Sequence, residues 1–151
     1  MGHHGWYHGM FAEQGYRFTN PRRAVLDVLN STQGHLSAEE VYLEVHTHYP
    51  SIGLATVYRT LELLERMGLL LKFDFGDKRA RYELSQDPGG PRHHHHLVCT
   101  GCGRIIDYTD FVAEEKELLK KAESGLSKKY NFVINNHVIN FYGRCEKCRN
   151  E

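Results

Sequence analysis

The spacing of apolar residues predicts three helices in the first 84 positions, because residues three and four apart share one face of a helix. The first follows Asn20 and Pro21, where Asn20 can cap the helix and Pro21 suits its first position. The second follows Ser37 and Glu40, whose spacing is that of a capping box, and runs towards Tyr49.

The third predicted helix begins near Leu54 and carries the clearest apolar stripe. Its buried face comprises Leu54, Val57, Leu61 and Leu64. Gly68 lies where a glycine commonly ends a helix. The opposite face is therefore expected to be exposed.

Two short runs that alternate between apolar and polar residues follow this helix. One face of the first run comprises Leu69, Leu71, Phe73 and Phe75, and one face of the second comprises Ala80, Tyr82 and Leu84. Residues 76–78 form the expected turn of a hairpin. Three helices followed by a hairpin are the plan of a winged helix-turn-helix.

The remainder of the chain predicts a second, smaller module. Residues 85–92 contain two prolines and two glycines and are typical of a linker. Beyond them the pattern predicts strands at 97–99 and 104–108, a helix at 110–130, and strands at 132–134 and 138–142. The expected fold class is α+β, with an N-terminal winged helix-turn-helix domain (1–84), a hinge linker (85–92) and a small C-terminal α/β domain (93–151). A core this small predicts both a metal staple and a partner subunit.

Composition indicates an ordinary soluble protein. The 151 residues are 40% hydrophobic and 25% charged, and 19 basic side chains balance 19 acidic ones. Bulk charge therefore gives no support for nucleic-acid binding, which has to rest on where a few arginines lie. No apolar run approaches the length needed to span a bilayer, and the start lacks the apolar core of a secretory signal. We expect a cytoplasmic protein without a membrane partner.

All four cysteines occur in two Cys-x-x-Cys pairs, Cys99 with Cys102 and Cys145 with Cys148. Two such pairs can surround one ion with four thiolates, the usual form of a structural zinc site. Disulfide bonding is the alternative, but paired spacing in a cytosolic chain favours metal. The pairs bracket the C-terminal third, so one zinc ion would join its start to its end.

Four consecutive histidines, residues 93–96, precede the first cysteine pair. If this stretch is extended, alternate side chains point to opposite sides, which separates His94 and His96 from His93 and His95. Imidazole and carboxylate together suit iron, manganese or zinc. The alternative is a flexible histidine-rich loop.

A metal site drawing on both modules is one way to use this run. His35 and Glu83 belong to the first module, and Asp107 to the second. A site combining His35, Glu83, His94 and His96 would fix the angle between the modules and act as a switch. Taken singly, however, His35 is more typical of a loop histidine and Glu83 of a solvated strand residue.

DNA contacts are expected on the third helix, whose side opposite the apolar stripe carries Thr56, Arg59, Thr60 and Arg66, with Tyr58 at its edge. Such side chains can reach base edges and phosphates. Further basic residues are Arg17, Arg22 and Arg23 before this helix and Lys78, Arg79 and Arg81 in the hairpin. A solvated surface is the alternative, and useful affinity needs a dimer on a palindromic site.

Several motifs occur in an order that resembles the ferric uptake regulator family, from about Phe11 onward. They are Gly-His35-Leu-Ser-Ala-Glu-Glu, Gly53-Leu-Ala-Thr-Val-Tyr-Arg-Thr-Leu61, Arg81-Tyr-Glu83-Leu, His93-His-His-His-Leu-Val-Cys-Thr-Gly-Cys-Gly103, Asn136-His137 and Tyr142-Gly-Arg-Cys145-Glu-Lys-Cys148. The resemblance implies a dimeric, metal-dependent transcription regulator, usually a repressor, that dimerises through its second module.

The resemblance also implies three metal sites and a DNA-contacting surface. The structural zinc ligands fall on Cys99, Cys102, Cys145 and Cys148, and the regulatory ligands on His35, Glu83, His94 and His96, with Asp107 nearby. A third site falls on His93, His95, Glu114 and His137, where His95 replaces a frequent aspartate. The DNA-contacting positions implied are Arg17, Tyr58 and Arg59.

The family divides by signal into iron, zinc, manganese, nickel and peroxide sensors, the last reading peroxide through bound iron. Glu83 and the Tyr58-Arg59 pair resemble the iron-uptake branch, whereas Asp107 is closer to the peroxide-sensing branch. We therefore expect Fe(II) as the regulatory ion, with Mn(II) or Zn(II) as alternatives, and iron-uptake genes as targets. The extra His3, His4 and His8 fit a solvated tail, an expression remnant or an accessory metal contact.

Two other classes of protein are disfavoured. A zinc hydrolase would need an open metal position and a base, but the sequence has no His-Glu-x-x-His, nucleophile elbow or phosphate loop. A metal buffer without DNA function would not need the third helix and the basic hairpin.

Overall fold

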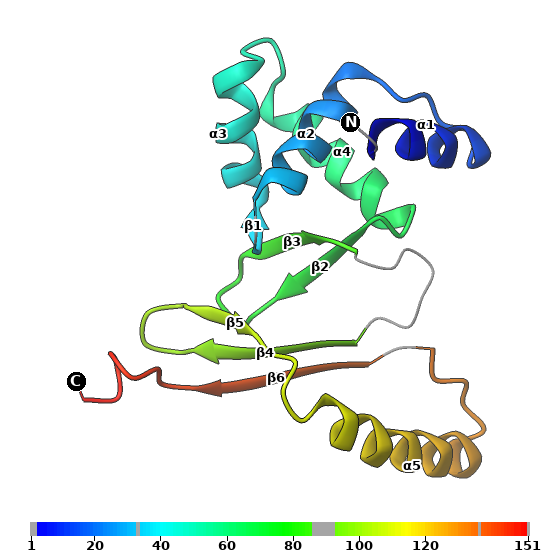
Figure 1. Cartoon of the computed structure of the whole chain (residues 1–151), viewed down its shortest axis with the longest axis vertical. Helices are drawn as coiled ribbons and strands as arrows, with labels where there is room; N and C mark the ends of the chain where they lie inside the picture. Colours follow the sequence, from blue (N-terminus) through cyan, green and yellow to red (C-terminus); the bar gives the residue numbers. More distant parts are fainter. Residues whose placement is uncertain (1–2, 33, 86–92, 136, 151) are drawn as a thin grey trace. The chain divides into compact units, whose positions relative to one another are not determined.

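The computed structural model describes residues 3–32, 34–85, 93–135 and 137–150, with the side chains of residues 3, 4, 93 and 94 outside that description. The chain divides into two compact units, Met1–Pro88 and Gly89–Glu151. Figure 1 colours them from blue to green and from yellow-green to red, and each is described here by itself. Residues 86–92 lie outside the described residues, so the proposed linker at 85–92 and its boundaries stay a prediction.

Unit 1 has the predicted winged helix-turn-helix fold. Its elements are α1 (His3–Glu13), α2 (Asn20–Ser31), β1 (Leu36–Ser37), α3 (Ala38–His48), α4 (Leu54–Arg66), β2 (Leu70–Asp74) and β3 (Ala80–Leu84). The three strands form an antiparallel sheet in the order β1-β3-β2. The hairpin β2–β3 is the wing.

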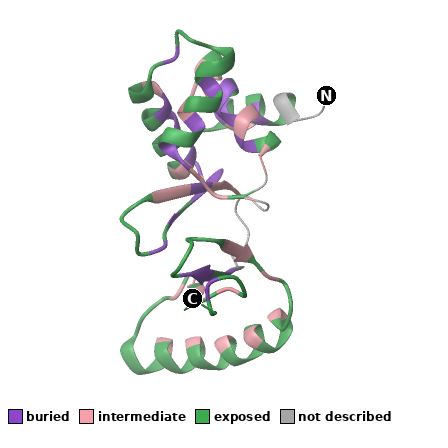
Figure 2. Ribbon diagram, turned by 90° about the vertical axis from the view of Figure 1, so that its left-hand side faces the viewer, coloured by how far each residue is buried: buried purple, intermediate pink, exposed green. Residues whose placement is uncertain are grey.

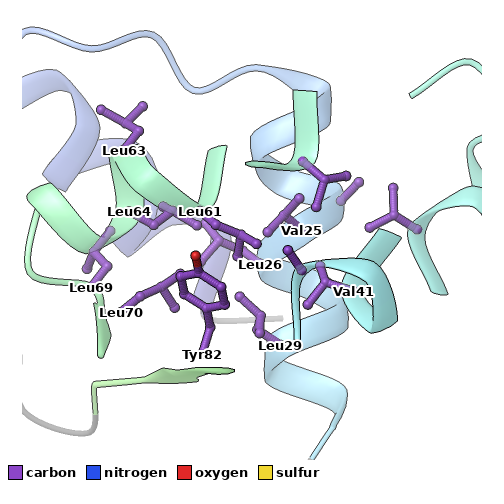
Figure 3. Close-up of a cluster of buried hydrophobic side chains, with 14 of the residues drawn as sticks. Val25, Leu26, Leu29, Val41, Leu61, Leu63, Leu64, Leu69, Leu70 and Tyr82 are labelled. Carbon is purple, nitrogen blue, oxygen red and sulfur yellow. The ribbon is translucent and has the colours of Figure 1, made fainter. Parts of the chain in front are cut away.

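The core of unit 1 lies where α2, α3 and α4 meet one face of this sheet. Figure 3 shows Leu26 of α2, Val41 of α3 and Leu61 of α4 converging with Tyr82 of β3. Leu61 has no exposed surface and Tyr82 is only 2% exposed. Burial of these side chains fixes the position of α4 against the rest of the unit.

Local sequence signals set most helix ends in unit 1. Ser37 accepts a hydrogen bond from the Glu40 amide at 3.2 Å, and the Glu40 carboxylate accepts one from the Ser37 amide at 2.7 Å, which confirms the capping box. Gly68 has φ +75°, and Leu69 donates to the carbonyl of Leu64, which confirms the expected end of α4. The prediction that Asn20 caps α2 was wrong by one residue, because Thr19 holds that position and makes no side-chain cap.

A helix that the apolar pattern did not predict begins unit 1. In α1, Phe11 is fully buried and Tyr7 is 6% exposed, and the Tyr7 hydroxyl lies 3.3 Å from Asn30 Oδ1. The described part of α1 is therefore a packed helix whose His8 side chain is exposed, and the alternatives for His3 and His4 stay predictions. Tyr7, Phe11 and the half-buried Met10 pack against the core and occupy a single helical repeat, so the sequence lacks the sustained apolar spacing of a longer amphipathic helix.

The wing presents apolar side chains on both faces. Leu70 and Tyr82 join the core beneath the helices. Strand register puts Leu71 opposite Glu83 and Phe73 opposite Arg81, so these residues share the other face. The two predicted apolar stripes are thus real but lie on opposite sides of the sheet.

Unit 2 has the predicted ββαβ order. Its elements are β4 (His93–Cys99), β5 (Ile105–Asp107), α5 (Val112–Tyr130) and β6 (His137–Gly143). The central strand β4 pairs antiparallel with β5 and parallel with β6. The strand expected at 132–134 was wrong, because this stretch is irregular and leaves Phe132 and Val133 64% and 78% exposed.

Helix α5 lies loosely against its sheet. No residue of this fully described helix is buried, and its half-buried side, pink in Figure 2, comprises Val112, Glu115, Leu119, Glu123 and Ser127. Leu118 is 69% exposed. Two carboxylates therefore belong to the inward side of α5, and apolar surface remains on the outward side.

Replacing Phe11 with alanine tests whether α1 is an integral part of unit 1. We expect Phe11→Ala to lower the free energy of unfolding by about 3 kcal/mol, because it empties a fully buried aromatic site. Trp6, the single tryptophan, lies in α1 and reports the transition in a urea titration. Leu43→Ala, at a position 63% exposed, is the control and should change stability little. Equal stability of Phe11→Ala and the parent would show that α1 does not contribute to the core.

Candidate metal centres and nucleic-acid interface

The four cysteines of unit 2 converge on one point. Their Sγ atoms all lie within 4.8 Å of one another, and those of Cys102 and Cys145 are 3.8 Å apart. Four sulfurs, each about 2.3 Å from a central zinc ion, are about 3.8 Å apart in a regular tetrahedron. A disulfide would need about 2.05 Å. The donor set and its spacing therefore fit one tetrahedral zinc ion.

Backbone amides around the sulfurs favour thiolates. Hydrogen bonds from the amides of Cys102 and Cys145 lower the pKa of Cys99 to about 6, and the amide of Cys148 lowers the pKa of Cys145. The side chain of Cys145 raises the pKa of Cys148 to about 12, because a proton held there bridges neighbouring sulfurs. A cation would remove the need for that proton.

Gly101 allows the two cysteine turns to approach closely. A Cβ at position 101 would lie 2.8 Å from the Cβ of Cys148 and 3.0 Å from its Sγ. Real Cβ atoms essentially never approach another atom so closely, so any other residue would push the turns apart. Thr100 also donates from its amide to the carbonyl of Gly143 at 2.8 Å, which joins the first turn to the end of β6.

Unit 1 holds a histidine–carboxylate pair. His35 Nε2 lies 3.0 Å from Glu83 Oε2 on the wing. The imidazole ring of His35 meets Phe73 and Phe75 edge-on, with centroids 5.4 and 5.5 Å apart. These rings hold the orientation of an imidazole that reaches a carboxylate.

Unit 2 holds a second pair on one face of β4. His96 Nε2 lies 3.3 Å from Asp107 Oδ1, and its Nδ1 lies 3.0 Å from Asn140 Oδ1 on β6. Because an amide oxygen only accepts hydrogen bonds, Nδ1 carries the proton and Nε2 keeps a lone pair in the neutral ring. A partner that fixes the tautomer in this way is typical of metal-binding histidines.

The opposite face of β4 meets α5 through a separate polar cluster. His95 Nδ1 pairs with the Glu115 carboxylate, which also accepts a 2.8 Å hydrogen bond from Tyr108. Burial and that hydrogen bond raise the pKa of Tyr108 to about 12. His137 Nδ1 lies 2.6 Å from Glu123 Oε1, and the rings of His95 and His137 are 6.3 Å apart.

One ring nitrogen of this cluster, His95 Nε2, is available to bind a ligand. His95 is buried, and its Nε2 finds no hydrogen-bond partner among the described residues. A buried polar atom without a partner is costly unless a ligand satisfies it. Two imidazoles and two carboxylates therefore form a chemically reasonable site for a divalent cation.

A hollow of about 410 Å³ lies beside α4 in unit 1. The polar and charged groups lining it include Thr19, Arg22, Thr56, Arg59, Glu62 and Arg66. Arg22 also donates to the carbonyl of Arg17 and lies over the ring of Phe11. Three guanidinium groups around one hollow suit an anionic ligand such as a phosphate.

The exposed side of α4 differs in part from the expectation. Arg59 is exposed and Tyr58 is 37% exposed, but Thr56 is half-buried. The expectation that Thr60 is exposed was wrong, because Thr60 is only 5% exposed. The stretch 60–64 turns most of its side chains into the core, so a hydroxyl at position 60 faces inward.

The wing tip is basic but partly neutralised within itself. Asp77 accepts a hydrogen bond from Arg81 at 2.6 Å, and this bond lowers the pKa of Asp77. Lys78 and Arg79 remain exposed. The wing thus offers these two side chains as the accessible cations at its tip.

Comparison with known proteins gives one consistent result. The sequence profile of the ferric uptake regulator family matches residues 13–142. The ferric uptake regulation protein of Bacillus subtilis is 42% identical over 134 residues, covering 88% of this chain and 85% of that protein. This chain belongs to the ferric uptake regulator family.

Solved structures agree with this family assignment. The ferric uptake regulator of Vibrio cholerae has a TM-score of 0.69 and 34% identity, covering 92% of this chain and 99% of that one. The peroxide stress regulator of Campylobacter jejuni has a TM-score of 0.64 and 32% identity, covering 85% and 88%. The fold, and with it the α+β class, is therefore that of ferric uptake regulators.

The structure brings many of the predicted family site residues into pairs and clusters. The four cysteines converge, His35 meets Glu83, and His96 meets Asp107. The side chains of His93 and His94 lie outside the described residues, so their ligand roles stay predictions. Arg17 is exposed, and its backbone carbonyl accepts a hydrogen bond from the Arg22 side chain.

At the predicted third family site, the structure shows contacts between the histidines and two other glutamates of α5. Among the described contacts of His95 and His137 none involves Glu114, which is exposed in the first turn of α5. Glu115 and Glu123 make those contacts instead. Glu115, Leu119 and Glu123 are each four residues apart and share one face of α5, a spacing that is visible in the sequence. Asn140 had no such signal, because its contact with His96 depends on the parallel register of β4 and β6.

Substituting Gly101 tests the close approach of the cysteine turns. We expect Gly101→Ala to release zinc to a chelator about tenfold or more readily, because the added methyl group collides with Cys148. The measurement is competition against a chromogenic chelator. Gly143→Ala, where an added Cβ meets nothing within 4 Å, is the control. Equal zinc retention in both variants would contradict the packing argument.

Proposed function

We propose that this chain is a homodimeric, metal-responsive repressor that binds double-stranded DNA at a palindromic operator. The observation that carries the proposal is that each unit holds a histidine–carboxylate pair, His35 with Glu83 and His96 with Asp107. The regulatory ion takes His35, Glu83, His94 and His96, with Asp107 as a nearby carboxylate. Because its ligands come from both units, the ion favours one hinge arrangement over the others, and DNA affinity follows that equilibrium.

Two further ions have different roles in the proposal. Zn(II) at the four cysteines is structural, since a closed four-sulfur shell leaves no open coordination position. The third ion lies at His95 and His137, with His93 as a further ligand. Glu115 and Glu123 are better supported as its carboxylates than Glu114, since they contact these histidines.

Unit 2 is the proposed dimerisation domain. Apolar side chains that stay exposed on it include Leu97, Leu118, Leu126, Val138 and Phe141, each at least 42% exposed. A second copy would cover such surface, which a small domain with little core leaves in water at a cost. Dimerisation also supplies the two recognition helices α4 that a two-fold operator requires.

The proposed DNA-binding surface comprises Tyr58 and Arg59 of α4, Thr56 beside them, and Arg17 before α2. The arginine-lined hollow beside α4 supports phosphate contacts next to base contacts. The exposed Lys78 and Arg79 of the wing tip add further positive charge.

Fe(II) is the proposed regulatory metal and iron-uptake genes are the proposed targets. The relative from Bacillus subtilis is named a ferric uptake regulation protein, which supports iron. A peroxide-sensing role is the second candidate, because the carboxylate beside His96 is the aspartate Asp107 and a peroxide stress regulator is 32% identical. Zinc and manganese sensing are further alternatives within the family.

The family is one of transcription regulators, and the proposal assigns no catalytic reaction to this chain. None of the helices in the described part of the chain combines the length and the apolar character needed to cross a membrane. The proposed location is the cytoplasm, where the operator is.

The main test is a metal titration of DNA binding. Fluorescence anisotropy on a Fur-type palindrome is measured anaerobically with Fe(II), Mn(II) or Zn(II), on protein that keeps its cysteine-bound zinc. We expect Fe(II) to activate binding and peroxide to leave it intact. Release by peroxide, with oxidised histidine in the mass spectrum, would favour the second candidate. Activation only by sub-nanomolar zinc would indicate a zinc sensor, and no metal-dependent binding would refute the switch.

His96→Ala, in the same titration, should abolish activation by metal while the cysteine-bound zinc and the dimer persist. The reason is that His96 belongs to the regulatory set and lies on the strand face away from α5. His48→Ala, an exposed histidine of α3, is the control. Unfolding of His96→Ala by circular dichroism would contradict the separation of regulatory from structural roles.

Arg59 and Arg66 should differ in what they contribute to DNA binding. Arg59→Gln is expected to weaken operator binding about tenfold more than binding to unrelated DNA, as a base contact does. Arg66→Gln should weaken both alike and reduce the slope of log affinity against log salt by about 0.9 per protomer, as a phosphate contact does. Lys121→Gln, on α5, removes the same charge elsewhere and should leave both measurements unchanged. If only Arg59→Gln changed the slope of log affinity against log salt, Arg59 rather than Arg66 would be the phosphate contact.

A further inference from the structure

Glu39 contacts the tyrosine of the proposed recognition helix. The Tyr58 hydroxyl donates a hydrogen bond of 2.6 Å to Glu39 Oε1. Glu39 is the second residue of α3 and Tyr58 the fifth of α4, so the bond joins the two helices of the helix-turn-helix. A short bond to a carboxylate is the stronger, charge-assisted kind.

This bond is not needed to hold the two helices together. Val41 and Val45 of α3 and Val57 and Leu61 of α4 are fully buried in the common core. Tyr58, by contrast, is 37% exposed and Glu39 is exposed. The bond therefore acts mainly on the direction of the tyrosine ring and of its hydroxyl group.

The bond also decides which hydrogen bonds Tyr58 can offer to another molecule. A phenol has one proton to donate, and a carboxylate can only accept it. The hydrogen bond from Tyr58 lowers the pKa of Glu39, and the same bond raises the pKa of Tyr58. The proton thus stays on the tyrosine and points at Glu39. What remains for DNA is an acceptor oxygen and an apolar ring.

We propose that Glu39 is a positioning residue for sequence reading, which holds Tyr58 so that it presents an acceptor and an apolar ring to base edges. This inference rests on the proposed DNA-binding function. In the major groove an acceptor suits the amino groups of adenine and cytosine, and the ring suits the methyl group of thymine. Tyr58 therefore has no proton left to donate to phosphates, thymine O4 or guanine O6.

The charge of Glu39 makes this role distinguishable from simple stabilisation. A carboxylate at a DNA-binding surface repels phosphates of every sequence. Arg79 of the wing acts on Glu39 as a nearby positive charge and helps to lower the pKa of Glu39. Loss of the carboxylate should therefore reduce the repulsion of DNA of every sequence. It should also remove the hydrogen bond that orients Tyr58.

The test compares operator and unrelated DNA for the full-length, metal-loaded protein. We expect Glu39→Ala to reduce the ratio of the two affinities by about threefold to tenfold, without weakening binding to unrelated DNA. Glu39→Gln keeps an oxygen that accepts a hydrogen bond and should retain most of the ratio. Glu44→Ala, an exposed carboxylate on the same helix, is the control for charge and should leave the ratio unchanged.

A double-mutant cycle shows whether Glu39 acts through Tyr58. Once Tyr58→Phe has removed the hydroxyl group, Glu39→Ala should have no further effect on the ratio. Additive effects would overturn the inference, as would equal weakening of operator and unrelated DNA by Glu39→Ala. An unchanged ratio in Glu39→Ala would overturn it too.

A measurement without DNA separates this inference from the proposed function. In protein carrying tyrosine labelled at its ring Cζ carbon, NMR titration should show the pKa of Tyr58 falling in Glu39→Ala. An unchanged titration would mean that the bond does not form in solution. If the parent protein bound no operator with any metal, the proposed function would fail irrespective of this titration.

Discussion

Unit 2 buries few apolar side chains among its described residues, so the four sulfurs carry much of the packing between the end of β4 and the last turn. Val98 is the main buried aliphatic residue of its sheet, and α5 buries none. Cys99 ends β4, and Cys145 follows closely after β6. In the proposed function, coordination of one zinc ion by these four thiolates supplies the stability that a larger core would otherwise give.

Signals that act within a few residues could be interpreted correctly from the sequence. The capping box at Ser37, the helix stop at Gly68 and the spacing of the cysteine pairs each specify their own local geometry. Most of the order of strands and helices followed from such signals, because an apolar period and a turn residue together define an element; the exceptions are α1, β1 and the strand expected at 132–134. The fold class was therefore predictable in most of its parts.

Features that depend on distant partners were not predictable in the same way. Helix α1 packs against the core through Tyr7, Met10 and Phe11, a single helical repeat that is too short to stand out as a periodic pattern. Thr60 is polar yet buried, because its place on α4 is decided by packing against the rest of unit 1. Likewise, the contact of Glu115 with His95 depends on how α5 is rotated over the sheet, which sequence spacing leaves open.

The parallel pairing of β4 with β6 has a consequence for sensing. Side chains of a strand alternate between its faces, so a slip of one residue would move His96 to the face of His95 and reverse every histidine of the run. Histidine follows histidine through this stretch, and composition alone would tolerate either register. The cysteine turns beyond both strands exclude the slipped alignment, because it would carry Cys99 away from Cys145. In the proposed function, the zinc ion at the cysteines thereby determines which histidine side chains can bind the regulatory ion.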